Sequence, residues 1–234
     1  MGTRSPLSDI WPLYDLVVRT PRIELRYPSD EDLSKLARLP DEGVHEPGKV
    51  PFHVAWTEEP SPARERNSLQ WWRNKQASWS VDEWSLPFAV IDDGEPVGVQ
   101  DLFGRHFPVL RSVSTGSWLV RRAQGRGVGA EMRAAVVEFA FRGLGALEAH
   151  SAAFDWNERS RRVSEKVGYE PNGEELLLSA GGRVRTLRYR MSREKWVTNQ
   201  RDDIDIIGLE RCLDLFGLGA DLEPIGESEE APPK

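Results

Sequence analysis

A glycine-rich turn, set between an apolar run and a long apolar-periodic segment, is the feature that most constrains how this chain can fold. It follows Trp118, Leu119 and Val120, precedes residues 131–142, and consists of Gln124, Gly125, Arg126, Gly127, Val128, Gly129 and Ala130. This order predicts a strand, a tight turn and a helix. Glycines at alternate positions let backbone N–H groups approach a ligand, and the positive end of the helix points at the same place. The sequence therefore predicts a phosphate-binding turn.

Size and composition indicate a soluble globular protein. The chain has 234 residues, of which 39% are hydrophobic and 29% are charged. It contains no run of membrane-spanning length and no apolar segment typical of a signal peptide, so we expect a cytoplasmic protein without a membrane partner. The single cysteine, Cys212, excludes an internal disulfide and a thiolate-rich metal site. A net charge of −7 argues against general nucleic-acid binding and favours a cationic substrate.

The first sixty residues predict a strand, a helix and a long loop. Residues 1–20 lack a sustained period, and we interpret them as an irregular N-terminal arm that lies on the body. Alternating apolar residues at 22–27 predict a strand with one buried face, after which Ser29 or Asp30 caps a helix that ends near Leu39. Residues 40–60 are rich in proline and aromatic residues, which predicts an ordered loop lining a cavity.

The next sixty residues predict a tryptophan-rich helix and three antiparallel strands. The helix spans residues 61–80 with Pro62 at its first position, and its tryptophans are expected mainly in the core, with a substrate wall as the alternative. Asp93 and Gly94 join strands at 86–92 and 96–102 into a hairpin. A third strand is expected at 109–120, where Gly116 indicates a bulge or a close backbone approach.

The second half of the chain predicts helices at 130–142 and 155–167, separated by a short parallel strand at 146–154. Asp155 and Glu158 fit a capping box for the second helix, on which Ser160 and Ser164 share a face. Strands at 174–179 and 183–191 form a final hairpin through residues 180–182. Residues 193–218 are expected to pack on the domain as an extension with an edge strand at 204–206, and 219–234 to form a disordered acidic tail.

This order of elements, together with three motifs, resembles the GNAT superfamily of CoA-dependent N-acyltransferases over residues 21–192. Gln124-x-x-Gly127-x-Gly129 fits the superfamily's pyrophosphate signature. The runs at 115–119, 124–133 and 157–169 look most like the RimJ/RimL branch, which acetylates protein N-terminal amines. The resemblance implies an α+β fold, with a mostly antiparallel, twisted central sheet that is splayed at the cofactor cleft and flanked by helices.

The resemblance also implies how acetyl-CoA binds. The amides of residues 126–130 would hold the pyrophosphate, with charge-assisted bonds from Arg121, Arg122 or Arg126. A bulge at Gly116 would splay the sheet, so that the pantetheine arm pairs with the backbone of Trp118, Leu119 and Val120. Asn157 would bond the pantetheine, act as a plain helix cap, or do both.

The implied reaction is direct attack of a primary amine on the acetyl thioester in a ternary complex. Many relatives carry a tyrosine acid at the position of Ser164, so Ser160 and Ser164 are the candidate acids, with Ser160 ranked first because the RimJ/RimL branch uses a serine near the sulfur. The place of the usual glutamate base is Ser114, which leaves Asp101, a loop histidine (His53 or His106) or water. No cluster of potential ligands has metal-binding spacing, so we expect no metal.

Other interpretations of the glycine turn are weaker. A Rossmann site would use Gly125, Gly127 and Gly129 with Glu148 downstream, but the last glycine spacing is missed, and a P-loop fails for lack of Gly-Lys-Ser/Thr. A non-catalytic acyl-CoA-binding module, acting as a sensor or scaffold, is the main rival because Ser114 replaces the base. The acceptor, a protein N-terminus or a small-molecule amine, and the choice between monomer and homodimer stay open.

Overall fold

The structure is a computed structural model that describes residues 6–179 and 182–219. Within these residues nine strands form one sheet, in the order β7-β8-β6-β5-β4-β3-β2-β1-β9. All neighbours are antiparallel except β5 and β6, which run parallel. The strands are β1 Val17–Arg19, β2 Ile23–Arg26, β3 Glu83–Asp92, β4 Glu95–Arg105, β5 Ser112–Leu119, β6 Glu148–Phe154, β7 Glu170–Ser179, β8 Gly182–Ser192 and β9 Asp205–Ile207. The predicted α+β fold with a mostly antiparallel sheet is confirmed.

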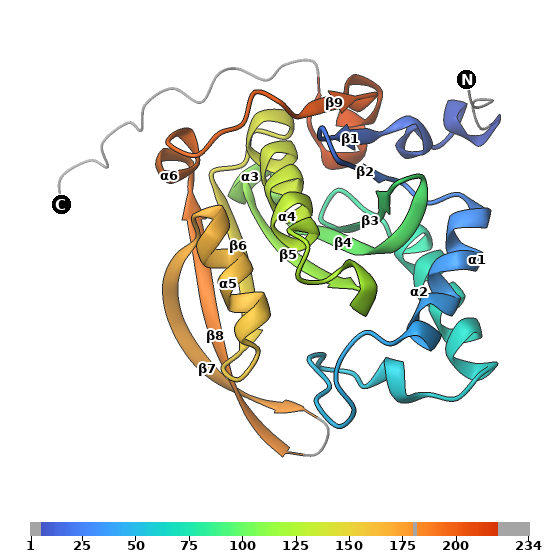
Figure 1. Cartoon of the computed structure of the whole chain (residues 1–234). Coiled ribbons are helices and arrows are strands. Elements are labelled where there is room, and N and C mark those ends of the chain that lie inside the picture. The colour runs from blue at the N-terminus through green and yellow to red at the C-terminus, as the bar shows by residue number, and fades with distance from the viewer. Residues whose placement is uncertain (1–5, 180–181, 220–234) are drawn as a thin grey trace.

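Helices cover both faces of this sheet (Figure 1). Because successive strand residues point to opposite faces, Phe88 and Val90 pack in the larger core with α4, whereas Ala89 and Ile91 pack in a smaller cluster with α1 and α2. The helices are α1 Asp30–Arg38, α2 Ala63–Ala77, α3 Phe107–Leu110, α4 Val128–Glu138, α5 Glu158–Val167 and α6 Arg193–Val197. Among the described residues, no helix has the length and apolar character needed to cross a membrane.

The N-terminal arm is more regular than expected. Leu13, Leu16 and Val18 are fully buried in the larger core. Residues Val17–Arg19 form β1, which pairs with β2 on one side and with β9 on the other. The interpretation of residues 1–20 as irregular was therefore wrong for this part, because a three-residue strand is too short to show a period of two.

The first two helices follow the sequence with small shifts. Ser29 caps α1 in a capping box, accepting from the Asp32 N–H while the Asp32 carboxylate accepts from the Ser29 N–H. Pro62 immediately precedes α2 instead of occupying its first helical position. Trp72 is buried in the smaller cluster, and Trp79, which lies beyond the helix, stacks on Trp84 with ring centroids 5.8 Å apart. Trp72 is therefore a core residue and Trp79 packs against the core, whereas Trp71 is 41% exposed.

The three central strands form the expected meander. The hairpin turn is confirmed, with Asp93 at φ 55° and Gly94 at φ 78°, the left-handed conformation that such a turn requires. The third strand begins at Ser112 and not at residue 109, because Phe107–Leu110 form the short helix α3 with Phe107 fully buried. The strand is correspondingly shorter than predicted.

The following βα unit contains one clear correction. Asn157, and not Asp155, caps α5, and its side-chain oxygen accepts from the Ser160 N–H at 3.2 Å. The Asn157 N–H in turn donates to the Phe154 carbonyl at 2.9 Å, so Asp155 belongs to the turn that leaves β6 and stands too early to cap the helix. Farther on, β7 and β8 form the predicted hairpin, although Ala180 and Gly181 lie outside the described residues.

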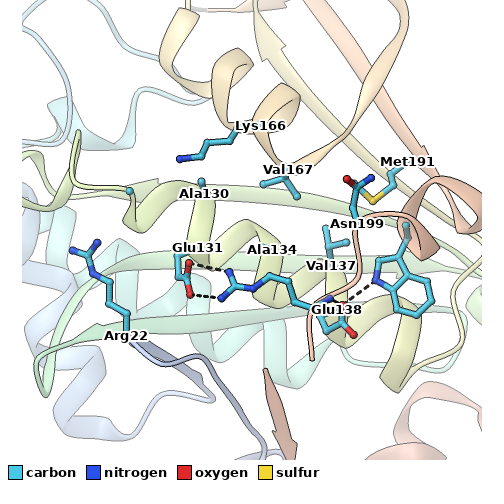
Figure 2. A pocket seen from close by; sticks show the side chains of 13 residues that line it. Arg22, Ala130, Glu131, Ala134, Val137, Glu138, Lys166, Val167, Met191 and Asn199 are labelled. Carbon is cyan, nitrogen blue, oxygen red and sulfur yellow. Dashed lines mark hydrogen bonds and ion pairs between the residues drawn. The ribbon is translucent and has the colours of Figure 1, made fainter. Parts of the chain in front are cut away.

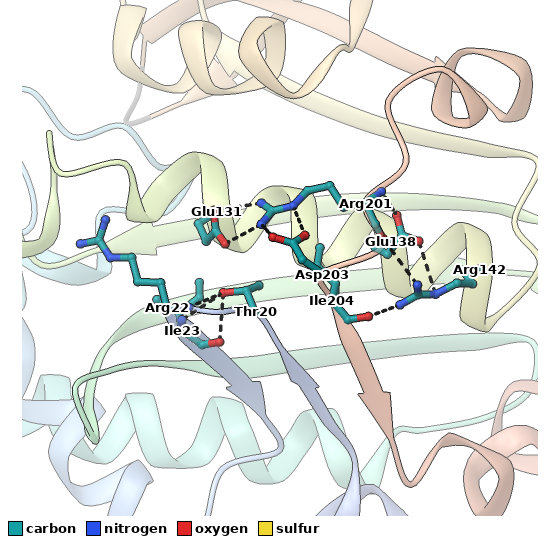
Figure 3. A network of polar contacts seen from close by, with 9 residues as sticks. All are labelled: Thr20, Arg22, Ile23, Glu131, Glu138, Arg142, Arg201, Asp203 and Ile204. Atoms are coloured by element: carbon teal, nitrogen blue, oxygen red, sulfur yellow. Dashed lines mark hydrogen bonds and ion pairs between the residues drawn. The ribbon is translucent and has the colours of Figure 1, made fainter.

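The C-terminal extension is fastened to α4 by a polar network (Figure 3). Arg201 donates to both oxygens of Glu131 in α4, at 3.0 and 3.1 Å, and to Asp203. Glu138, at the end of α4, accepts from the Trp196 indole at 3.0 Å. The predicted edge strand is confirmed as β9, and the fully buried Phe216 packs beyond it in the larger core. The predicted acidic tail falls mostly on residues 220–234, outside the described ranges.

Candidate active site

The glycine turn is held by backbone conformations that only glycine adopts readily. Gly125 has φ 71° and Gly127 has φ 89°, and α4 begins directly after Gly127. Gly129 has a different role, because a Cβ placed there would meet Val163 of α5 at 3.4 Å. The turn therefore leads directly into α4, whose first N–H groups have no partner within the helix, and Gly129 lies at van der Waals distance from α5.

The side chain of Gln124 makes three hydrogen bonds that hold the turn in place. Its Nε2 donates to the carbonyls of Val44 and Leu119, both at 2.7 Å, and its Oε1 accepts from Arg159 of α5 at 2.9 Å. The side chain thus connects the turn with the 40–60 loop, with β5 and with α5.

Sequence reasoning missed an arginine that touches the turn. Arg22, just before β2, donates through Nη1 to the Arg126 carbonyl at 2.5 Å. Both arginines approach a single carboxylate, Asp92, at 3.7 and 3.9 Å. Two guanidinium groups that share one carboxylate leave a surplus of positive charge beside the glycines, which favours an anion there. No local pattern connects residue 22 with residue 126, so no sequence signal could have identified this contact.

The parallel strands β5 and β6 stop pairing close to the turn. Their last paired residues are Thr115 and Ser151. Beyond this point β5 stays bonded only to β4, up to Leu119, while β6 stays bonded to β8, up to Phe154. We call residues 116–119 and 152–154 the β5–β6 divergence. Among the residues that the structure describes, no strand pairs with this edge of β5, which lies next to the start of α4.

The expected bulge at Gly116 is not present. Pairing between β4 and β5 is continuous from Gly98–Leu119 to Gly104–Val113, with Gly116 opposite Asp101. The divergence therefore arises on the other side of β5, where β6 turns away with its antiparallel partner β8. A glycine inside a strand is compatible with either geometry, so the sequence could not distinguish them.

The two candidate serines have different environments. Ser160 lies in the first turn of α5 and is half-buried. Ser164 is fully buried, and its Oγ lies 3.2 Å from the Oγ of Ser151, the last β6 residue paired with β5. Ser164 is thus the hydroxyl connected to the beginning of the divergence.

A buried arginine lies against this hydroxyl pair. Arg133 of α4 is only 3% exposed, and its guanidinium donates to Ser151 at 2.7 Å, to Ser117 at 3.0 Å and to the Gln100 amide oxygen at 3.4 Å. All three partners are neutral. Burial lowers the pKa of Arg133, yet an arginine stays charged at neutral pH. The guanidinium of Arg133 therefore places a desolvated positive charge where β5 and β6 separate.

A loop crosses the same place on the other face of the sheet. We call residues 43–58 the roof loop. Its Trp56 ring lies 5.3 Å from Trp118 of β5, and its His53 ring lies 5.1 Å from Phe154 of β6. The roof loop thus contacts both strands of the divergence. That its aromatic residues line a cavity stays a prediction.

A cavity of about 310 Å³ extends from the turn along the groove between α4 and α5 (Figure 2). Its lining includes Arg22, Gly127, Lys166, Trp196 and Arg201. Three of these side chains are cationic, but the carboxylates of Glu131 and Glu138 also line the cavity, and Arg201 is paired with Glu131. The attraction for an anion is therefore strongest at the turn, where Arg22 lies beside the positive end of α4. Among the residues that the structure describes, no group of three or more potential ligands could hold a metal ion.

The features assembled above define a class of protein. A mostly antiparallel sheet whose one parallel pair diverges beside a glycine turn at a helix N-terminus is the architecture of a CoA-dependent N-acyltransferase. Residues 22–170 match the family described as the acetyltransferase (GNAT) domain. The chain therefore belongs to the GNAT acetyltransferase family, whose members transfer an acetyl group from acetyl-CoA to an amine. This is the activity of the chain, and the comparisons do not support the alternative of a non-catalytic binding module.

Solved structures show the same fold. Mycobacterium smegmatis RimJ in complex with a CoA disulfide has a TM-score of 0.65 and 20% identity, covering 86% of this chain and 94% of its own. RimL, a ribosomal alpha-N-protein acetyltransferase in complex with coenzyme A, has a TM-score of 0.62 and 13% identity, covering 75% and 97%. A GNAT-family acetyltransferase from Bacillus anthracis has a TM-score of 0.61 and 15% identity, covering 76% and 99%. These similarities show that the chain shares its fold with RimJ and RimL.

Proposed function

We propose that this acetyltransferase modifies the N-terminal amine of a protein. The observation that carries the proposal is the β5–β6 divergence, which begins beside Arg133, ends beside the glycine turn and is covered by the roof loop. RimJ and RimL share this fold, and RimL is named as an alpha-N-protein acetyltransferase. Residues 40–60 carry five acidic side chains, of which Asp41, Glu42 and Glu46 are paired with basic side chains. Glu58 and Glu59 are therefore the carboxylates of this loop that we expect to attract a cationic chain terminus.

Acetyl-CoA fits the residues that surround the divergence. We assign the pyrophosphate to the turn, because positive-φ glycines at a helix N-terminus bring backbone N–H groups to an anion. The pantetheine amides suit the strand edge of β5, which β6 leaves unpaired. In this proposal Arg22 adds charge, Gln124 fixes the turn, and the remaining contacts come from Trp118, Leu119, Val120, Gly125, Arg126, Gly127, Val128, Gly129, Ala130, Asn157 and Ser160.

The leaving thiolate requires a proton, and we assign its donor to Ser164. Arginine has no acceptor atom, so the Ser151 hydroxyl accepts from Arg133 and is free to donate to Ser164. The Ser164 proton is then available to the sulfur. The charge of Arg133, transmitted through two hydroxyls in a dry environment, favours this proton transfer. Arg133 acts as a positioning residue, and Ser160 remains the alternative donor.

A panel assay tests the proposed acceptor. The purified chain is incubated with acetyl-CoA and one of three amines: short peptides with a free N-terminus, the same peptides with a blocked N-terminus and internal lysines, or spermidine. Thiol release is followed optically, and the acetylated atom is located by mass spectrometry. We expect thiol release and a single acetyl group on the α-amine of the free peptides.

Two outcomes would overturn the proposal. Acetylation of spermidine or lysine without any α-amine product would show that the acceptor is a different amine. If acetyl-CoA raises the melting temperature while no amine releases thiol, the chain binds the cofactor without catalysis.

A further inference from the structure

Asp101 has an unusual place in the sheet. It lies in β4 between Gln100 and Leu102, which point toward α4: Gln100 contacts Arg133, and Leu102 lies in the larger core. Strand alternation therefore directs Asp101 to the opposite face, where Val99 packs with α1 and α2. Its carboxylate lies on the face covered by the roof loop, across the sheet from Arg133.

The position of Asp101 along β4 brings it to the beginning of the divergence. Asp101 is directly opposite Gly116 of β5, and Gly116 is the first residue after the last β5–β6 pair. Side chains that are directly opposite in an antiparallel pair share a face, with Cβ positions about 5 Å apart. Gly116 supplies no side chain, and a Cβ built there would meet its nearest neighbour, Phe103, only at 4.0 Å. A small group therefore has room beside the Asp101 carboxylate.

The Asp101 carboxylate is held by one hydroxyl. The Ser85 Oγ lies 3.0 and 3.1 Å from its two oxygens, and one hydroxyl proton can serve only one of them at a time. Burial raises the pKa of Asp101 to about 6, opposed by the Ser85 hydroxyl, by the charge of Lys75 and by the Leu102 N–H. A carboxylate with this pKa is ionised at neutral pH and still accepts a proton readily, as general-base catalysis requires.

We propose that Asp101 is the general base of the acetyl transfer and that it binds the ammonium group of the acceptor; this inference rests on the proposed function. The carboxylate takes one proton from the ammonium form, which leaves a neutral amine. The nitrogen lone pair then forms the C–N bond, and the C–S bond breaks with its electrons on sulfur. Sulfur receives the hydroxyl proton of Ser164, and the second nitrogen proton replaces that proton on Ser164. Asp101 releases the first proton to water.

The two loop histidines have other surroundings. His106 follows the end of β4, with a side chain 60% exposed and Nδ1 3.7 Å from Asp82. His53 makes an edge-to-face contact with Phe154 at the β6 side of the divergence, and its carbonyl accepts from Ser179. His53 thus supports the roof loop. Asp101, in contrast, lies opposite Gly116, where a small group has room.

Kinetics of four proteins test this assignment: the wild type and the variants D101N, S85A and D82N. Asp82 is 83% exposed and serves as the matched carboxylate control. Thiol release with acetyl-CoA and a free-N-terminus peptide is measured from pH 5.5 to 9, and thermal unfolding confirms that each variant is folded. We expect D101N to lower kcat by about 10²–10⁴ with little change in the KM for acetyl-CoA, and D82N to behave like wild type.

The S85A variant separates a chemical role from a structural one. Wild-type kcat should fall on acidification with an apparent pKa near 6. Removing the Ser85 donor disfavours the ionised carboxylate and raises the pKa of Asp101. In S85A the acidic limb of the pH profile, where kcat falls, should therefore move to higher pH, while activity at pH 8.5 is largely kept. In D101N the limb should disappear. A merely structural aspartate would not shift the limb in this way.

The possible failures are distinguishable. A wild type that releases no thiol with any amine refutes the proposed function itself. A wild type that is active, with folded D101N within about threefold of its kcat, refutes only the role of Asp101. An S85A profile that coincides with wild type would also contradict it, and S85A supplies this test even if D101N does not fold.

Discussion

Replacing Arg133 by methionine separates the catalytic role of the buried charge from its structural role. The guanidinium makes three hydrogen bonds to neutral groups and is almost fully buried. Hydrogen bonds that involve a charged group contribute about 1.5–3 kcal/mol each, but burying an ion costs several kcal/mol. These contributions oppose each other, so we expect the free energy of unfolding of R133M to change by no more than about 2 kcal/mol. For a chain of this size the melting temperature then shifts by less than about 8 °C.

The R133M variant should also lower kcat. Loss of one preorganised donor for developing negative charge typically lowers kcat about 10²–10³-fold. Because Arg133 acts through Ser151 and Ser164 and does not touch the sulfur, we expect a smaller loss, of about tenfold to 10²-fold. The KM for acetyl-CoA should be nearly unchanged, because the glycine turn is not altered. R133K keeps the charge but loses the planar geometry, so it should recover part of the rate.

Steady-state thiol release at saturating peptide, combined with thermal unfolding, provides the assay. Arg162→Met is the matched control, because Arg162 lies on α5 with a side chain 78% exposed. S151A interrupts the connection between Arg133 and Ser164 without removing the charge, and it should also lower kcat. A folded R133M variant with kcat within about fivefold of wild type would refute the reasoning.

Three further variants test other parts of the structure. Gly116→Val adds a side chain where a Cβ meets only Phe103, at 4.0 Å, so the protein should stay folded while its acetyl-CoA affinity, measured by calorimetry, falls about fivefold to a hundredfold. Gly98→Ala is the counterpart, since its Cβ would lie 2.2 Å from the Trp118 carbonyl oxygen, and it should lose about 1–3 kcal/mol or more in urea unfolding. Phe216→Ala removes a fully buried ring that packs on Trp79, Trp84 and Phe139, and we expect a loss of about 3–5 kcal/mol. Unchanged acetyl-CoA binding in the first variant, unchanged stability in the second, or a loss below about 1 kcal/mol in the third would contradict these expectations.

Local chemistry explains which parts of the fold the sequence predicted well. Asp93 and Gly94 adopt the left-handed turn that their residue types favour, and Ser29 caps α1 through a capping box. The glycines at 125 and 127 take positive φ angles directly before a helix, as their spacing predicts. In each case the determinant lies within a few residues, so a single stretch of sequence contains it.

The wrong predictions have a common physical origin: each depended on strand pairing that a short stretch of sequence does not contain. Asp155 and Asn157 are both good capping residues. The choice between them is made by the turn in which the Asn157 N–H bonds to the Phe154 carbonyl, and the position of this turn depends on where β6 leaves the sheet. Gly116 fits a bulge as well as it fits a flat strand edge. The strand β1 is visible only through its pairing with β2 and with β9, which lies almost 190 residues farther along the chain.

The sequence alone determined the order of most elements, the glycine turn, the class of cofactor and the family of this protein, because each of these depends on short-range patterns. Only the tertiary structure brought Arg22 to the turn, placed Arg133 against Ser151 and set Asp101 opposite Gly116. These contacts depend on strand register and on which sheet face a side chain occupies, and a shift of one residue would reverse the face. The turn therefore identifies what the protein binds, while the arrangement of the sheet around it decides how the reaction proceeds.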